Sequence, residues 1–257
     1  MTGGTALRKG LRRVGSFLLP SACAGCRGPY GGVATNVPLC PACRTRVRRP
    51  PAPRCGRCDF PRGTGRDDGS ECSECGDWPE ALAAARCAAV LEPPADRLVH
   101  GLKYEGWWRL SSFMARRMAN LDVPVPTGSS PVSGRWLVVP MPTTRRRLLA
   151  RGYNQAELLA REYARARNLP LWTGLVREET GATQVGLQPS ERRANVSGAF
   201  QLDGPRRVMA RHVLLVDDVL TTGATAGAAA QTLVAGGAAH VVLVAFGRAL
   251  TRSGWAG

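Results

Sequence analysis

The sequence predicts an α/β protein, in which a mostly parallel sheet carries helices on both faces and follows a small cysteine-rich domain. Three observations support this prediction. The 257 residues are enough for one α/β domain plus a small accessory domain. Eight cysteines form four C-x-x-C pairs in the first third of the chain. From about residue 85, apolar runs alternate with segments of helical periodicity, which is typical of parallel sheets.

The four cysteine pairs are two copies of one unit. Each unit has thirteen residues between its pairs, and each cysteine of the first unit lies 32 residues before its counterpart. Two C-x-x-C turns supply four thiolates to one tetrahedral ion, usually zinc, and leave it no open position for catalysis. The repeat favours sequential pairing, although a cross-braced pairing also fits the spacing. The expected zinc ligands are Cys23, Cys26, Cys40 and Cys43 for one ion, and Cys55, Cys58, Cys72 and Cys75 for the other.

These patterns divide the chain into four regions. They are a basic segment at 1–20, a double zinc-ribbon domain at 21–80, the α/β domain at 81–250 and a tail at 251–257. No apolar run approaches the roughly 20 residues of a membrane span. The apolar stretch Phe17–Leu19 is too short for a signal peptide. Because cysteines in this pattern suit metal better than disulfides, we expect a cytoplasmic protein without membrane contact.

Positive charge is concentrated at the start of the chain. The formal net charge is +16, and no acid precedes Asp59 although eleven basic residues do. A field of that sign attracts phosphates, including those of nucleic acid. A solvated, arginine-rich surface is the alternative explanation of the same composition.

The α/β domain is expected to contain four strands. The apolar runs place them at 86–92, 135–142, 212–217 and 240–246, with helices at 96–106, 107–121, 154–169 and 225–235. Asn154 with Glu157 resembles a capping box at the start of the third helix. Polar, glycine-bearing segments at 123–134 and 177–200 predict loops.

The stretch "VLLVDDVLTTGAT" (213–225) carries the strongest functional signal. Ligands of such sheets lie beyond the carboxyl ends of the strands, where Asp217 and Asp218 are expected. The "TTGAT" segment then leads into a helix, so its backbone N–H groups form an anion nest to which three threonine hydroxyls can add. Two carboxylates would repel that anion, so they must face sugar hydroxyls or Mg²⁺ beside it. The pattern predicts a site for a ribose 5-phosphate.

This stretch resembles the phosphoribosyl-pyrophosphate (PRPP) motif of the type I phosphoribosyltransferases, and the whole chain resembles the ComF family. In that family a zinc module precedes a phosphoribosyltransferase-like domain. The matching pieces are "LLPSACAGC", the paired C-x-x-C units, "VHGLKYEG", "VPMPTTRRRLLARGYNQAELLA", "TQVGLQPSERRANVSGAF" and "VLLVDDVLTTGAT". The resemblance covers about residues 17 to 249.

The resemblance implies a role for each part of the motif. Asp217 and Asp218 would bind the ribose hydroxyls, directly or through Mg²⁺. The expected catalytic residues are these two aspartates and Arg192. The 5-phosphate would be held by Thr221, Thr222, Gly223, Ala224 and Thr225. The pyrophosphate would meet the loop around Pro142, Thr143, Thr144 and Arg145. The segment 178–197, with Arg192 and Arg193, would close as a lid over PRPP. Lys103 and Tyr104 would face the cleft, or a helix surface instead.

Two functions of different class are expected. The first is a Mg²⁺-dependent phosphoribosyltransferase that transfers phosphoribosyl from PRPP to an unknown acceptor. The alternative is a non-catalytic PRPP sensor or a single-stranded-DNA-associated factor in natural competence, with a helicase-like partner. The resemblance implies the second role, and the basic zinc module fits it.

Overall fold

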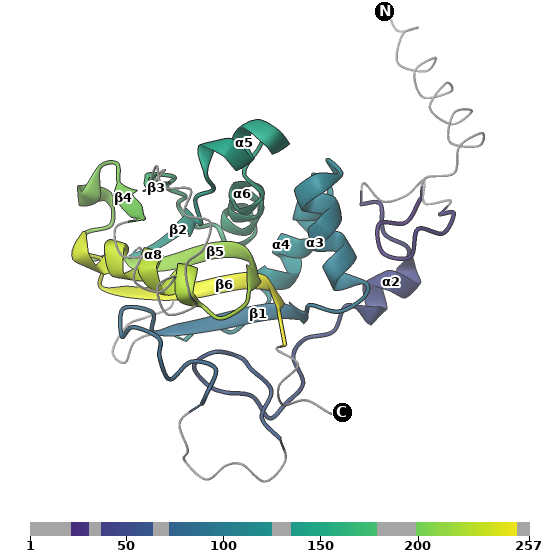
Figure 1. Ribbon diagram of the computed structural model, residues 1–257, viewed down its shortest axis with the longest axis horizontal. Helices are drawn as coiled ribbons and strands as arrows, with labels where there is room; N and C mark the ends of the chain where they lie inside the picture. The colour runs from purple at the N-terminus through teal and green to yellow at the C-terminus, as the bar shows by residue number, and fades with distance from the viewer. Residues whose placement is uncertain (1–21, 31–36, 64–71, 125–134, 179–198, 251–257) are drawn as a thin grey trace, which may run out of the picture.

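The computed structural model describes residues 22–30, 37–63, 72–124, 135–178 and 199–250. Four parallel strands form one sheet in the order β1-β6-β5-β2, and β3 and β4 form a separate antiparallel pair (Figure 1). The strands are β1 Ala84–Val90, β2 Trp136–Pro140, β3 Leu175–Arg177, β4 Phe200–Leu202, β5 His212–Leu220 and β6 His240–Arg248. The helices are α2 Pro41–Arg46, α3 Ala95–Tyr104, α4 Leu110–Ala119, α5 Arg145–Arg151, α6 Gln155–Arg167 and α8 Ala224–Ala235, with a 3-10 turn at Pro205–Arg207.

Alternation of side chains along each strand divides the interior into two hydrophobic cores. Leu214 and Val216 of β5 point to one face and pack with residues of α3, α4 and α6. Val213 and Leu215 point to the other face and pack against α8. Both faces of the strands are therefore buried, as the near-continuous apolar runs of the sequence predict. The predicted α/β fold with a parallel sheet is confirmed.

The two cysteine units lie on opposite faces of this sheet. We call Cys23–Cys43 the first cysteine unit and Cys55–Cys75 the second. Buried residues of the first unit belong to the core on the α3 and α4 side. Those of the second unit belong to the core on the α8 side. Figure 1 shows the same arrangement, with α2 beside α3 and the second unit beyond β1. Within the described residues, the segment expected as one ribbon domain thus packs as two separate parts.

Some elements differ from expectation. β5 does not end at Asp217, as expected, but continues through Asp218 to Leu220. The segment expected as a loop after β2 forms helix α5, none of whose residues is buried. Trp108, which falls within the helix expected at 107–121, lies between α3 and α4 and is exposed. Asn154 does cap α6, because its side chain accepts a hydrogen bond from the Ala156 N–H.

The ninth cysteine, Cys87, is fully buried in β1, as expected for a small apolar side chain. Among the described helices, none is both long and apolar enough to cross a membrane.

Candidate functional site

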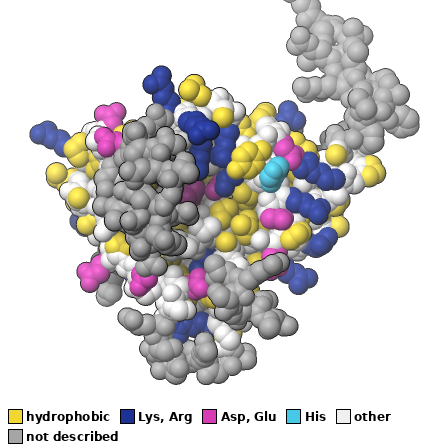
Figure 2. Space-filling model, in the orientation of Figure 1, with side chains coloured by type: hydrophobic (Ala, Val, Ile, Leu, Met, Phe, Trp, Pro, Cys, Tyr) yellow, Lys and Arg dark blue, Asp and Glu magenta, His cyan; other side chains and the backbone are white. Residues whose placement is uncertain are grey.

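A cavity of about 570 Å³ opens at the carboxyl ends of β2 and β5, where parallel sheets place their ligands. Its lining combines acids, hydroxyls and arginines from five elements and their loops. Of the residues named from the sequence, those that line it are Lys103, Tyr104, Pro142, Thr143, Asn154, Asp217, Asp218, Thr221, Gly223 and Thr225. Figure 2 shows that Lys and Arg side chains gather over α5 and on the side formed by the first cysteine unit.

The two carboxylates occupy different environments although they are neighbours on β5. Asp218 is buried, and its Oδ2 forms an ion pair with the Lys103 Nζ of α3 at 2.9 Å. Asp217 is partly exposed, and its Oδ1 accepts a hydrogen bond from the Asp218 N–H at 2.8 Å. Removal from water, and then the charge of Asp218, raises the pKa of Asp217 to about 8. The pocket therefore contains a carboxyl group that is poised to lose its proton when a cation binds.

The segment Thr221–Thr225, here called the phosphate loop, joins β5 to α8. The turn depends on Gly223, which has φ +83° and precedes the first residue of the helix. The Thr222 hydroxyl accepts a hydrogen bond from the Ala224 N–H at 3.4 Å, so Thr222 and Ala224 shape the turn. Thr221, Gly223 and Thr225 line the cavity itself. The start of an α-helix of twelve residues thus meets the pocket, and such a terminus favours an anion.

Three arginines also line the cavity: Arg147, Arg151 and Arg177. Arg147 and Arg151 lie four residues apart on α5, and therefore on one face of that helix. Burial, and then the nearby charge of Arg147, lowers the pKa of Arg177. The sequence prediction named Arg145 for the pyrophosphate rather than Arg147, Arg151 or Arg177. The four-residue spacing of Arg147 and Arg151 could have indicated from the sequence that they share a helix face. Arg177 lies on the short strand β3, and no sequence pattern marked it as a site residue.

Other residues predicted for the site lie elsewhere. Thr144 caps α5, where its hydroxyl accepts a hydrogen bond from the Arg147 N–H at 3.3 Å. Arg145 is the first residue of that helix and is exposed, and it is not among the residues that line the cavity. Arg192 and Arg193 lie outside the described residues. Tyr104 stands at the rim, where its hydroxyl accepts a hydrogen bond from Arg151 at 3.2 Å.

The eight paired cysteines form two separate clusters. Cys23, Cys26, Cys40 and Cys43 make one, and Cys55, Cys58, Cys72 and Cys75 make the other; within each, the sulfur atoms lie within 4.8 Å of one another. The sequential pairing is therefore confirmed and the cross-braced alternative is not adopted. Thiolates about 2.3 Å from a tetrahedral zinc ion are about 3.8 Å apart. Observed Sγ–Sγ distances of 3.7 Å for Cys55–Cys75 and Cys58–Cys72 fit that geometry.

Each cluster includes one cysteine with a lowered pKa, whereas burial raises the pKa of Cys43 in the first cluster and of Cys58 and Cys75 in the second. Burial opposes ionisation, but hydrogen bonds from backbone N–H groups outweigh it and lower the pKa of Cys23 to about 6. The same balance lowers the pKa of Cys55 to about 7. Thiolates are the metal-binding form of cysteine, so both clusters are suited to a metal ion.

No protein-family model matches the sequence. Among solved structures, the allosteric regulatory enzyme of purine biosynthesis aligns with 52% of this chain, at 18% identity and a TM-score of 0.35. A glutamine PRPP amidotransferase from B. subtilis aligns at 19% identity and a TM-score of 0.34. Each of these two alignments covers 25% of the other protein's chain.

Similarity to curated proteins extends over most of the chain. The DNA utilization protein YhgH of Escherichia coli O157:H7 is 30% identical over 225 residues, which are 87% of this chain and 95% of that protein. The YhgH protein of strain K12 matches to the same extent. Competence protein F of Haemophilus influenzae is 29% identical over 79% of this chain and 86% of its own length. The identity and coverage, together with the two four-cysteine clusters, show that this chain belongs to the YhgH/ComF family.

Proposed function

We propose that the protein binds PRPP with Mg²⁺ in the cavity at the carboxyl ends of β2 and β5. The observation that carries this proposal is the position of an acid pair beside a phosphate loop in one cavity. The loop favours a phosphate and the carboxylates disfavour one, so a ligand that fits both must carry a phosphate next to a diol or a metal ion. PRPP has these groups in this order.

The arginines supply the third part of the proposed site. PRPP carries a pyrophosphate on the anomeric carbon, at the other end of the ribose from its 5-phosphate. Arg147, Arg151 and Arg177 line the cavity and together offer the positive charge that a pyrophosphate needs. Of the residues predicted to contact the pyrophosphate, we keep Thr143 and replace Thr144 and Arg145 by these three arginines, which line the cavity. Arg192 keeps its proposed place in a lid.

We propose further that the bound PRPP is a phosphoribosyl donor. In this reaction the bond between the anomeric carbon and the pyrophosphate oxygen breaks. A bond from the acceptor to that carbon forms, and the acceptor loses a proton. Positive charge develops on the ribose, as in glycosyl transfer, and negative charge develops on the leaving pyrophosphate. The acid pair and the arginines are suited to stabilise these two charges, respectively.

Zinc is the metal that we propose for both cysteine clusters. Four protein thiolates complete its coordination, so each ion would stabilise the fold and take no part in the reaction. Cysteines that bind a metal instead of forming disulfides need a reducing compartment. The proposal therefore places the protein in the cytoplasm.

The first experiment is calorimetric titration of the zinc-loaded protein with PRPP, with and without Mg²⁺. We expect binding that depends on Mg²⁺ in the wild type and is abolished in the double variant Asp217→Asn, Asp218→Asn. Asp122→Asn is the matched control, because Asp122 is exposed and does not line the cavity. PRPP affinity that survives in the double variant, at an unchanged melting temperature, would refute the site.

A second candidate function is contact with single-stranded DNA during DNA uptake, with a helicase-like partner. Two observations favour it. YhgH and competence protein F carry names that refer to DNA utilization and competence. A second cavity of about 310 Å³ is lined by three arginines, Arg46, Arg48 and Arg49, together with Glu92 and apolar residues. Such a cluster offers phosphate contacts but no base readout.

A further inference from the structure

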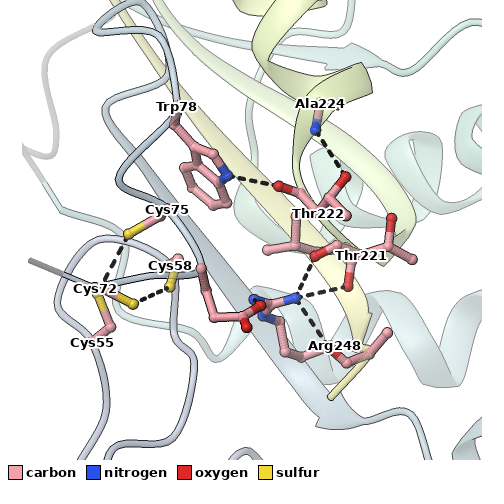
Figure 3. A network of polar contacts seen from close by, with 12 residues as sticks. Cys55, Cys58, Cys72, Cys75, Trp78, Thr221, Thr222, Ala224 and Arg248 are labelled. Carbon is pink, nitrogen blue, oxygen red and sulfur yellow. Dashed lines mark hydrogen bonds and ion pairs between the residues drawn. The ribbon is translucent and has the colours of Figure 1, made fainter. Parts of the chain in front are cut away.

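Two side chains join the second cysteine unit to the phosphate loop (Figure 3). Trp78, three residues after Cys75, donates a hydrogen bond from Nε1 to the Thr222 carbonyl at 2.8 Å. Arg248, the last residue of β6, donates from Nη1 to the Thr221 carbonyl. The Nη2 atom of the same guanidinium lies 3.4 Å from Oε2 of Glu74, which stands between the ligands Cys72 and Cys75.

Both side chains are held rigidly. Trp78 is 7% exposed and Arg248 is fully buried. Arg57, between two cysteines of the second cysteine unit, donates to the Cys75 carbonyl at 3.1 Å and to the Trp78 carbonyl at 3.2 Å. The Arg248 guanidinium lies 5.0 Å from the centre of the Phe60 ring of the same unit.

The indole of Trp78 also packs directly against the turn of the phosphate loop. A Cβ atom on Gly223 would lie 2.5 Å from both Nε1 and Cε2 of Trp78. That distance is a clash, so the contact needs glycine in addition to the positive φ of this residue. The phosphate loop therefore takes its position from the second cysteine unit as well as from the strand that precedes it.

These contacts set the direction of the peptide groups in the phosphate loop. In a planar trans peptide, the carbonyl of one residue and the N–H of the next point in opposite directions. The Leu220 carbonyl accepts from the Ala249 N–H at 2.9 Å, and the next two carbonyls accept from Arg248 and Trp78. The N–H groups of Thr221, Thr222 and Gly223 therefore all point away from these donors. Successive N–H groups with a shared direction form a nest for an anion.

We propose that Trp78 and Arg248 are positioning residues that direct these N–H groups toward the 5-phosphate, and that they couple phosphate affinity to the second cysteine cluster. The inference rests on the proposed function, since it deepens the role of the same site. Assembly of the cluster fixes Trp78 and Glu74, and through them it fixes the carbonyl side of the phosphate loop. The first cysteine unit packs on the other face of the sheet and has no such contact among the described residues.

The first test is Trp78→Phe, which removes the hydrogen bond to Thr222 and keeps an aromatic ring against Gly223. One net hydrogen bond corresponds to a factor of about five in an equilibrium constant. We expect the affinity for ribose 5-phosphate and for PRPP to fall by up to about five-fold, with zinc content close to wild type and a lower melting temperature, because the hydrogen bond is already present in the free protein. Trp136→Phe is the matched control, because Trp136 is equally buried but lies at the amino end of β2. Unchanged affinity in Trp78→Phe would overturn the inference.

Arg248→Lys provides a second variant. Lysine keeps the charge but lacks the planar fork that reaches the Thr221 carbonyl and Glu74 together, so affinity should fall again. Coupling to the cluster is tested by comparing Cys72→Ser with Cys26→Ser, each of which removes one ligand from one cluster. Cys72→Ser should lower ribose 5-phosphate affinity more than Cys26→Ser does. Equal losses in the two variants would contradict the coupling.

Hydrogen exchange separates the inference from the proposed function. If the wild type binds neither ribose 5-phosphate nor PRPP, the proposed function fails. The amides of residues 219–225 still report the positioning role in that case. Faster exchange there in Trp78→Phe than in Trp136→Phe would support it, and identical exchange would overturn it.

Discussion

Binding of Mg²⁺ and PRPP should release a proton from Asp217. Its carboxyl is removed from water and lies next to Asp218, and these effects raise its pKa to about 8 in spite of the opposing charge of Lys103. At pH 7 the group is therefore protonated in about nine molecules of ten. A metal ion coordinates the ionised carboxylate, so binding at this pH must first displace the proton.

The size of the effect follows from the ionised fraction. That fraction grows about five-fold from pH 7 to pH 8 and less than about two-fold from pH 8 to pH 9. The association constant for PRPP in the presence of Mg²⁺ should rise in the same proportions. The phosphates of the ligand contribute little to this rise, because their second pKa lies at about 6.

Calorimetry at pH 7, 8 and 9, in two buffers that differ in ionisation enthalpy, measures both the affinity and the released proton. We expect the heat at pH 7 to depend on the buffer and the heat at pH 9 to depend on it much less. The control Asp122→Asn should keep the wild-type profile. An affinity that is constant across this range, with heats that do not depend on the buffer, would refute the assignment of a raised pKa to the metal-binding carboxyl.

Three further predictions concern other parts of the molecule. Metal analysis should find about two zinc ions per chain, and about one in Cys26→Ser or Cys72→Ser; an iron–sulfur spectrum, or folded protein without metal, would contradict the zinc proposal. Arg192→Ala should lower kcat more than it weakens ground-state PRPP binding if the lid acts on the transition state, and steady-state kinetics beside calorimetry would reveal equal losses if it does not. Replacement of Arg46, Arg48 and Arg49 by alanine should weaken single-stranded DNA binding and flatten its dependence on salt, measured by fluorescence anisotropy; an unchanged salt slope would exclude this cluster as the DNA contact.

The sequence predicted the sheet well because its strands are buried on both faces. β2, β5 and β6 appear as continuous apolar runs, and the periodicity of the repeat predicted which cysteines share a cluster. Helix α5 was expected as a loop because it buries no residue and therefore shows no apolar stripe. The extension of β5 through the acid pair was missed for a related reason. A carboxylate inside a strand is favourable only with a partner, and the partner of Asp218 is Lys103 on another element.

Contacts over long sequence separations were beyond the reach of local patterns. Trp78 and Thr222 are 144 residues apart, and Glu74 and Arg248 are 174 apart. Neither Trp78 nor Arg248 was named from the sequence as a candidate for the site. The sequence marked the phosphate loop itself but held no signal for the side chains that fix its carbonyls.

The two cysteine units contact opposite walls of the same cavity. The first unit holds α3, where Arg97 donates to the Gly25 carbonyl at 2.9 Å and Arg27 pairs with Glu105 just beyond the helix. That helix carries Lys103 to Asp218, while the second unit holds the phosphate loop through Trp78.

Removal of zinc should therefore weaken PRPP binding even though neither cluster has an open coordination position. Such a loss would not show that zinc takes part in the reaction. The informative comparison is between the two clusters. Loss of zinc from the first cluster should weaken PRPP binding through Lys103 and the acid pair. Damage to the second should act through the phosphate loop. Titration with inorganic phosphate, which lacks the ribose hydroxyls that the acid pair would bind, separates these two routes, since it reports the phosphate loop most directly.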